Sequence, residues 1–78
     1  MSGCGPVRIV FMGYLSELAG GREREVEVCG EASILEIVRI EGVNMEDLVI
    51  LVNGRAARPS DTVRPGDKVT IMPHISGG

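Results

Sequence analysis

Hydrophobic and polar residues alternate along two stretches of the first half of the chain. Apolar residues occupy every second position of residues 7–12, and the opposite face of this stretch is partly apolar too. Glutamates occupy every second position of residues 23–29, with Val26 and Val28 on the other face. A period of two residues is typical of β-strands. We therefore predict two strands here, the second of them half-solvated.

The second half of the chain predicts two longer strands and a short return arm. Residues 48–52 form a continuous apolar run, which is typical of a strand covered on both sides, so we expect it at the centre of the sheet. Residues 53–54 are an Asn-Gly pair, which favours a tight hairpin with residues 55–57 as its return arm. Residues 64–67, Arg-Pro-Gly-Asp, predict a type II turn that leads into a last strand over residues 68–72.

Two short helices are expected between these strands. Residues 14–19 carry apolar positions at helical spacing, and Gly20 supplies the stop. Ser33 and Glu36 form a capping-box pattern that begins a second helix, and Gly42 is expected to end it. The apolar stripe expected to pack this helix against the sheet consists of Ile34, Ile37, Val38 and Ile40.

The order of these elements indicates the fold class. Strand, strand, helix, strand, hairpin arm and strand is the order of a β-grasp fold of the α+β class, in which a mixed sheet curls around one main helix. We expect a flexible leader over residues 1–6, the β-grasp domain over residues 7–73 and a flexible tail over residues 74–78. The chain shows no internal repeat.

Composition narrows the classes of function. The 78 residues are 44% hydrophobic and 24% charged, which suits one small domain with a thin core. The formal net charge of −3 argues against nucleic acid as a partner. The longest apolar run, residues 48–52, is far shorter than the ~20 residues of a membrane helix, and no signal-peptide pattern is present. We therefore expect a cytoplasmic protein that does not bind membranes.

The two cysteines lack the spacing of a metal site. Cys4 and Cys29 lie far apart in the chain, with neither the paired spacing of a zinc site nor the four thiolates of an iron–sulfur cluster, so no metal is expected. The spacing does not exclude one disulfide. Because Cys4 falls in the expected leader and the cytoplasm is reducing, we predict two reduced thiols.

The sequence ends with two glycines, Gly77 and Gly78. A residue without Cβ lets the backbone thread a narrow channel, and a terminal carboxyl group is ionised at neutral pH. Such a carboxylate can attack the α-phosphate of ATP, and the resulting acyl-adenylate is open to attack by sulfur or by an amine. A frayed chain end also tolerates glycine without any function, so the glycines alone leave both interpretations open.

Several motifs together resemble the MoaD family, the small sulfur-carrying subunits of molybdopterin synthase, which are related to ThiS and to ubiquitin. The motifs follow one another in the family's order along nearly the whole chain. They are residues 7–12 with 14–20, the Val-Asn-Gly-Arg turn of residues 52–55, the Arg-Pro-Gly-Asp-Lys-Val segment of residues 64–69, and the ending Met-Pro-His-Ile-Ser-Gly-Gly of residues 72–78. The resemblance implies a ubiquitin-like β-grasp fold.

The resemblance also implies a function and two partners. A ubiquitin-activating-type adenylyltransferase, similar to MoeB or ThiF, is expected to adenylate Gly78, and sulfur transfer then yields a thiocarboxylate. Gly77 lets the tail into the active site of the larger, MoaE-like subunit of molybdopterin synthase. The carrier itself is expected to bind no cofactor and to have no active site of its own, since ATP and Mg²⁺ belong to the activating enzyme.

Two groups of residues are candidate contacts with these partners. By the resemblance, the base of the tail contributes Met72, Pro73, His74 and Ile75. From the strand pattern, Val10, Leu51 and Met72 fall opposite the predicted core, where they form either an exposed apolar docking patch or an ordinary packed edge. A lone histidine such as His74 is more typical of a solvated or interface side chain than of a ligand.

Three alternatives to the molybdopterin role stay open at this point. The chain is also compatible with a ubiquitin-like modifier joined through Gly78 to lysines of other proteins. A sulfur carrier of the thiamine pathway would use the same chemistry at Gly78. A non-catalytic β-grasp interaction module would not need Gly77 or Gly78 at all.

Overall fold

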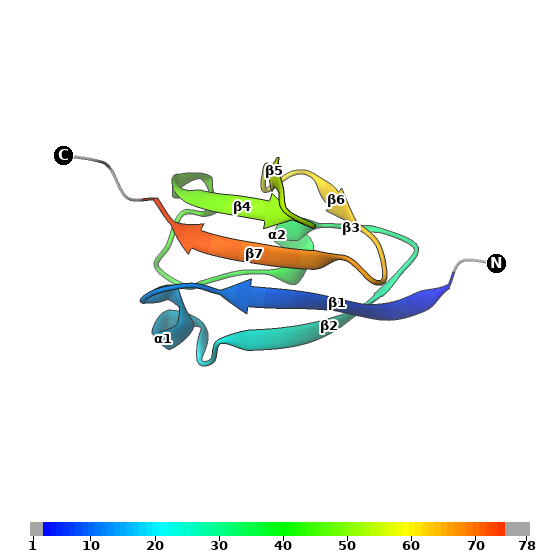
Figure 1. Ribbon diagram of the computed structural model, residues 1–78, viewed down its shortest axis with the longest axis horizontal. Coiled ribbons are helices and arrows are strands. Elements are labelled where there is room, and N and C mark those ends of the chain that lie inside the picture. The colour runs from blue at the N-terminus through cyan, green and yellow to red at the C-terminus, as the bar shows by residue number, and fades with distance from the viewer. Residues whose placement is uncertain (1–2, 75–78) are drawn as a thin grey trace.

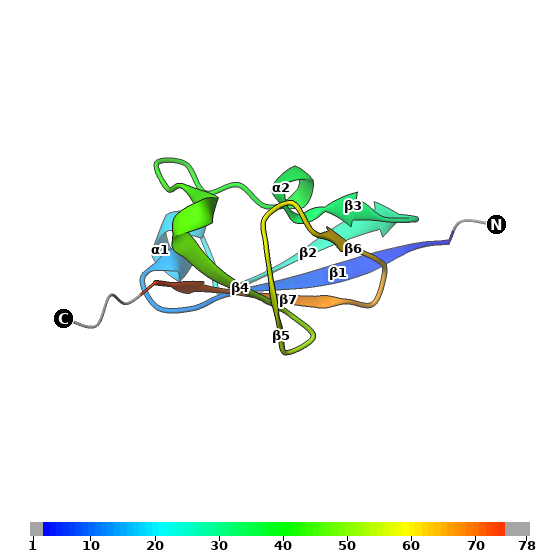
Figure 2. The ribbon, with the colours of Figure 1, turned by 90° about the horizontal axis from the view of Figure 1, so that it is seen from above.

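The computed structural model describes residues 3–74 and shows a twisted sheet with short helices on one of its sides (Figures 1 and 2). In chain order the elements are β1 (Cys4–Phe11), α1 (Leu15–Ala19), β2 (Glu23–Cys29), β3 (Ala32–Ser33), α2 (Ile34–Ile37), the 3-10 helix η1 (Met45–Asp47), β4 (Leu48–Val52), β5 (Arg55–Ala57), β6 (Thr62–Val63) and β7 (Lys68–Pro73). Within residues 3–74, no helix has the length and apolar character needed to cross a membrane.

The main sheet has five strands in the order β2-β1-β7-β4-β5. β7 runs parallel to β1 and antiparallel to β4, which confirms the predicted mixed sheet. β3 and β6 form a separate pair that the sequence pattern did not predict. The expectation that residues 48–52 are the central strand is wrong, because β7 holds that place and β4 lies next to it. Only Ile50 of β4 is fully buried, and Val49 and Leu51 on the outer side are half-buried, so the apolar run does not mark a strand that is covered on both sides.

β1 is longer than the alternation predicts. It begins at Cys4 instead of Val7, because Cys4, Gly5 and Pro6 pair in register with Cys29, Val28 and Glu27 of β2. The residues that we expected in a flexible leader therefore include the first three of this strand. The small residues of the segment gave no alternating pattern, so only the register with β2 reveals it.

The core lies between the sheet and the connections that carry the helices. Inward positions of β1, β4 and β7 alternate with outward ones, as the strand pattern predicts. Arg24 closes one edge of the core, since its guanidinium lies 5.4 Å from the centre of the Phe11 ring and donates a 2.8 Å hydrogen bond to the Ala19 carbonyl. The buried apolar residues are Val7, Ile9, Phe11, Leu15, Val28, Ile34, Val38, Ile40, Met45, Ile50, Val63, Val69 and Ile71.

The second helix begins as predicted and ends early. The Glu36 amide donates to Ser33 Oγ at 3.3 Å and the Ser33 amide donates to Glu36 Oε1 at 2.9 Å, which completes the capping box. The Ser33 amide hydrogen bond also lowers the pKa of the Glu36 carboxyl. α2 ends at Ile37, so the expected continuation to Gly42 is wrong. Val38 is already extended, with φ −129° and ψ 123°, and this β-branched residue is buried without helical backbone.

The two predicted turns are confirmed. Asn53 and Gly54 have φ values of 51° and 85°, which a two-residue hairpin of the primed type requires between β4 and β5. Gly66 has φ 95°, and the Asp67 amide donates to the Arg64 carbonyl at 3.0 Å, as a type II turn demands. The first turn sets the register of β5 against β4, and the second leads from β6 into β7.

Candidate functional site

The base of the C-terminal tail is held between β4 and the loop that follows β1. Pro73, the last residue of β7, lies opposite Leu48 in the antiparallel register. The Met12 amide donates to the Ile71 carbonyl at 2.9 Å. Gly13 has φ 59°, and a Cβ added to it would lie 3.4 Å from Pro73 Cγ, so the loop packs directly against the proline. His74 follows and is exposed, whereas Ile75, Gly77 and Gly78 lie outside the residues that the structure describes.

A hollow opens beside this base. It has a volume of about 530 Å³ and is lined by His74 and Tyr14 together with acidic residues of the η1 region, Glu46 and Asp47. Asn44 fixes the start of η1 by accepting a 3.0 Å hydrogen bond from the Glu46 amide. The hollow therefore places carboxylates next to the point where the tail leaves the domain.

Exposed apolar side chains surround the same end of the domain. Met12 is 45% exposed, Tyr14 59% and Leu18 54%. The sequence pattern placed Met12 in a strand and Leu18 on a helical stripe, so it missed this feature. The shortness of α1 is the signal that could have revealed it, because a helix of five residues turns only Leu15 fully into the core.

Val10, Leu51 and Met72 share the face of the sheet that is opposite the core. The register places Val10 and Leu51 on either side of Thr70, and Met72 opposite Val49. All of these apolar side chains are half-buried, and Figure 2 shows the helices on the other side of the sheet. We call Val10, Val49, Leu51 and Met72 the outer apolar face. Its role as a docking surface stays a prediction.

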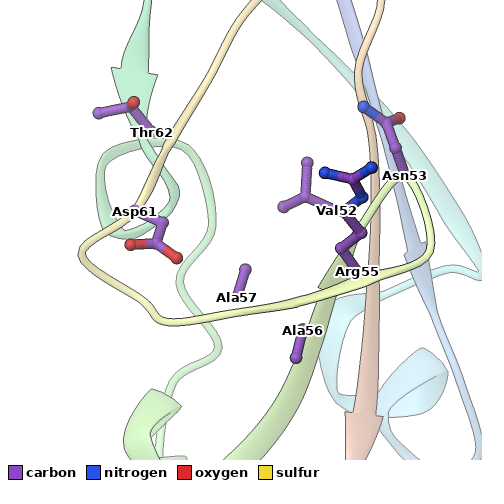
Figure 3. A pocket seen from close by; sticks show the side chains of 7 residues that line it. All are labelled: Val52, Asn53, Arg55, Ala56, Ala57, Asp61 and Thr62. Carbon is purple, nitrogen blue, oxygen red and sulfur yellow. The ribbon is translucent and has the colours of Figure 1, made fainter.

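A second hollow lies at the opposite end of β4 and is unrelated to the tail. Figure 3 shows its lining, which includes Arg55 of β5, Asp61 of the following loop and Thr62 of β6; its volume is about 640 Å³. Val52 lines this hollow and pairs with Val69, whereas Leu48 pairs with Pro73. The hollow is therefore separated from the tail base by the length of the strand.

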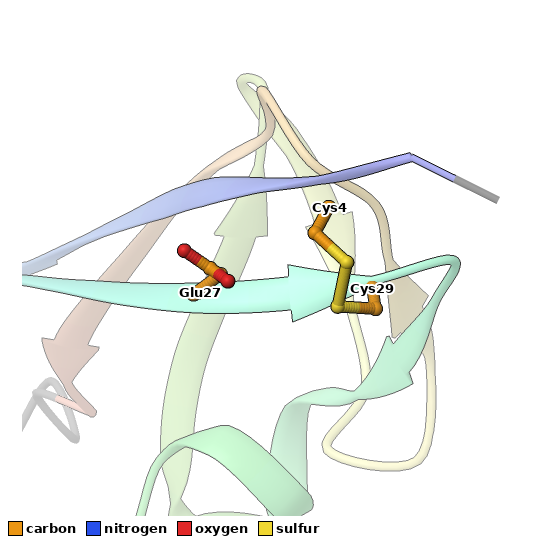
Figure 4. Close-up of side chains that lie close together, drawn as sticks. All are labelled: Cys4, Glu27 and Cys29. Atoms are coloured by element: carbon orange, nitrogen blue, oxygen red, sulfur yellow. A yellow bond between two sulfur atoms is a disulfide. The ribbon is translucent and has the colours of Figure 1, made fainter.

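Cys4 and Cys29 form a disulfide, so the predicted pair of reduced thiols is wrong (Figure 4). The antiparallel register of β1 and β2 places the two residues directly opposite each other. Their separation along the chain carried no sign of this. Glu27 lies on the same face, and one ligand atom from each of the three side chains lies within 4.8 Å of the others.

Fold and tail base together define the class of this protein: a small ubiquitin-like β-grasp domain whose C-terminal segment continues from the middle strand of its sheet. The model of the ThiS family matches residues 9–78, and the chain belongs to this family. The match confirms the resemblance to the MoaD and ThiS sulfur carriers. Carriers of the ThiS family work with ubiquitin-activating-type enzymes of the ThiF and MoeB kind.

Solved structures with the same fold come from the archaeon Haloferax volcanii. The crystal structure of SAMP1 shares 25% identity, covers 95% of this chain and 100% of its own, and has a TM-score of 0.71. A crystal structure of small archaeal modifier protein 1 shares 21% identity, covers 91% and 99%, and has a TM-score of 0.72. The solution structure of the HVO 2177 protein shares 19% identity, covers 97% and 89%, and has a TM-score of 0.76. These matches confirm the β-grasp fold.

Proposed function

We propose that this protein is the small, sulfur-carrying subunit of molybdopterin synthase and acts in the cytoplasm, with Gly78 as the acyl-bearing residue. The observation that carries the sulfur-carrier part of the proposal is the family match, which runs from residue 9 to residue 78 and so includes Gly77 and Gly78. The molybdopterin role rests on the resemblance of the sequence motifs to the MoaD family. The structure adds a rigid base for the tail, where Pro73 is packed against Gly13 and paired with Leu48.

The reaction takes place on the carrier's terminal carboxylate, in the active site of the activating enzyme. The Gly78 carboxylate attacks the α-phosphate of ATP and releases pyrophosphate, which leaves an acyl-adenylate. A sulfur nucleophile then displaces AMP, and the product is a thiocarboxylate that can pass sulfur to a pterin precursor. Mg²⁺ and ATP are supplied at the activating enzyme's site, and the carrier contributes the acyl group and its delivery.

The outer apolar face is proposed as the surface that both partners use. Met72 lies on this face and directly precedes Pro73, so the face continues without a break to the base of the tail. Half-buried apolar side chains on an uncovered sheet face are typical of docking sites. A MoeB-like or ThiF-like activating enzyme and a MoaE-like large subunit are the proposed partners, with His74 and Ile75 at the edge of the contact.

Intact-mass measurement tests the sulfur-carrier function. The protein is incubated with ATP, Mg²⁺, a sulfur donor and a ThiF-like or MoeB-like enzyme, beside a variant that lacks Gly78 and a Gly77→Ala variant. We expect one oxygen to be replaced by sulfur in the wild type, no change without Gly78, and slower conversion of Gly77→Ala because the new methyl group narrows the path of the tail. An unchanged wild-type mass with every such enzyme would falsify the proposal.

A second measurement assigns the pathway. The thiocarboxylate form is mixed with a MoaE-like subunit and a pterin precursor, and separately with the thiazole-forming system of thiamine synthesis. Formation of the dithiolene product in the first mixture alone is expected. Product in the thiazole mixture alone would assign the carrier to the thiamine pathway instead.

A protein-modifier role is the second candidate, because the SAMP1 structure covers 95% of this chain at 25% identity. The same acyl-adenylate would then be attacked by a lysine amine, which forms an amide in place of the thiocarboxylate. Trypsin cleaves after Lys68, so conjugation leaves residues 69–78 as a remnant on target lysines. Remnants that depend on Gly78 would favour this role, and their absence in cells that accumulate thiocarboxylate would favour the carrier role.

A further inference from the structure

Cys4, Cys29 and Glu27 form a cluster of metal-ligating side chains that the proposed function does not use. Cys4 begins β1 and Cys29 ends β2, at the end of the sheet away from Pro73 (Figure 1). All three residues are exposed, and one ligand atom from each lies within 4.8 Å of the others. Figure 4 shows the Glu27 carboxylate on the same side of the strand pair as the disulfide.

The backbone holds these side chains together whether or not the sulfurs are bonded. Cys4 and Cys29 face each other in the β1–β2 register, and the next pair outward is fixed by a 3.0 Å hydrogen bond from the Gly30 amide to the Gly3 carbonyl. Glu27 is two residues from Cys29, so it points to the same face. Breaking the sulfur–sulfur bond therefore leaves the three donors side by side.

Glu27 differs from its neighbour on the strand in what it faces. Glu25 lies opposite Arg8, which is the arrangement of a cross-strand charge pair. Glu27 lies opposite Pro6, which offers neither a charge nor an amide hydrogen. Its carboxylate therefore lies beside the sulfurs with no cationic residue directly opposite it in the register.

We propose that the reduced form of this protein binds one thiophilic divalent cation, with the chemistry of Zn²⁺, through the Cys4 and Cys29 thiolates and the Glu27 carboxylate. Thiolates select such cations over Mg²⁺ and Ca²⁺. Zn–S bonds of ~2.3 Å and Zn–O bonds of ~2.1 Å require three ligand atoms within the 4.8 Å that bounds the cluster, and the two sulfurs reach their positions by moving apart from their bonded distance once they are reduced. Water completes the tetrahedron.

Reduction is the step that opens the site. A dithiol reductant supplies two electrons and two protons, the Cys4–Cys29 sulfur–sulfur bond breaks, and the reductant becomes a cyclic disulfide. The cation then displaces both thiol protons into solvent as the two metal–sulfur bonds form. The oxidised protein has no thiolate to offer, so the redox state of one pair decides whether the cation binds.

Metal titration of the full chain tests the proposal. The protein is reduced with a dithiol, freed of it by anaerobic gel filtration, and titrated with ZnCl₂ by native mass spectrometry and with CdCl₂ by its ultraviolet sulfur-to-metal absorption. We expect one cation per chain in the reduced form and none in the oxidised form. Glu27→Gln is expected to weaken binding by about tenfold or more, since even an outer-shell partner contributes about that much. Glu25→Gln, the matched control, should bind as the wild type does.

Three results would overturn the proposal: reduced wild type that takes up no cation, equal uptake by oxidised protein, or equal affinity of Glu27→Gln and wild type. Circular dichroism accompanies each titration. If reduction loosens the fold, the cation is expected to restore the spectrum of the oxidised protein, because binding and folding are then coupled. A loosened chain that stays unfolded with excess Zn²⁺ would also count against the site.

Discussion

Asn53 and Asp67 tie two turns together through side-chain hydrogen bonds. Asn53 Nδ2 donates to Asp67 Oδ1 at 2.9 Å, and the Lys68 amide donates to Asn53 Oδ1 at 2.9 Å. Asp67 Oδ2 accepts from the Arg64 amide at 2.9 Å. The Arg64 amide, followed by the Asn53 side chain, lowers the pKa of the Asp67 carboxyl. The hairpin turn and the type II turn are therefore held by one ionised side chain.

Removing this carboxylate is expected to destabilise the protein in a pH-dependent way. Asp67→Ala loses two hydrogen bonds and should cost about 1–2 kcal/mol at neutral pH. Because the folded pKa is lowered from its ordinary value of 3.8, the contribution is complete above that pH and disappears as the pH falls through the folded pKa. Urea unfolding of both proteins at pH 7 and at pH 2 to 3 measures this. A difference that stays constant with pH would contradict the account, as would Asp67→Asn behaving like wild type at pH 7.

Gly13 provides a second test at the residue scale. Its φ of 59° strains any L residue, and a new Cβ would also press on Pro73 Cγ at 3.4 Å. Gly13→Ala is expected to cost about 1–2 kcal/mol from the backbone alone, plus the contact. Gly20 has a φ of 83° with open space around it, so Gly20→Ala is the control for backbone strain. Thermal melts should give Gly13→Ala a lower Tm than Gly20→Ala. The reverse order would rule out the proline contact.

At the scale of elements, local patterns predicted local structure. The bounds of β2, the start of α2 at Ser33 and the Asn53 hairpin depend on neighbouring residues, and all three are confirmed. The central place of β7 and the Cys4–Cys29 disulfide depend on which strands meet. The alternation of residues within one strand does not determine which strand it pairs with or in which register, so no local pattern could have predicted these features.

The candidate site also combines one feature that the local pattern predicted with one that it did not. The outer position of Leu51 followed from alternation along its strand, and the register confirms that it lies beside Val10 across Thr70. The acidic hollow beside His74 did not follow from the sequence, because Tyr14 precedes α1 and Glu46 belongs to η1, far away along the chain. Tertiary contact between distant segments was again the missing information.

The capping box of α2 gives a prediction for an element. The helix has four residues and a β-branched C-terminal neighbour, so its start is its main local support. Ser33→Ala is expected to lower the free energy of unfolding by about 1 kcal/mol. Ser33→Asp keeps an acceptor for the Glu36 amide and should retain most of the stability. Chemical denaturation of the wild type, Ser33→Ala and Ser33→Asp measures the free energy of unfolding. An equal loss of stability in both variants would show that the hydroxyl matters for something other than capping.

At the scale of the whole molecule, the chemistry-bearing features lie at opposite ends of the sheet. The tail base follows Pro73, where β4 begins, and the disulfide lies where β1 begins and β2 ends. The outer apolar face extends from the tail base along β1, β7 and β4. A partner that binds this face and the tail can therefore do so without contacting Cys4 or Glu27.

A charged substitution on the outer apolar face tests the docking proposal. Leu51→Glu places a charge on a half-buried apolar surface and is expected to weaken binding of the activating enzyme by about tenfold or more, which corresponds to about 1.4 kcal/mol. Leu35 is 40% exposed on α2, on the other side of the sheet, so Leu35→Glu should bind normally. Binding is measured by calorimetry after melts confirm that both variants are folded. Equal weakening of the two would argue for a general charge effect.

Within residues 3–74, the middle strand of the sheet is also the last strand to be synthesised. Until β7 leaves the ribosome, the strand pair β2–β1 and the strand pair β4–β5 are not joined in one sheet, since β7 is the strand that pairs with both β1 and β4. A nascent or prematurely stopped chain thus has two loose ribbons and no continuous outer face. A partner that binds the outer apolar face, as proposed, therefore binds only chains in which β7 has joined the sheet.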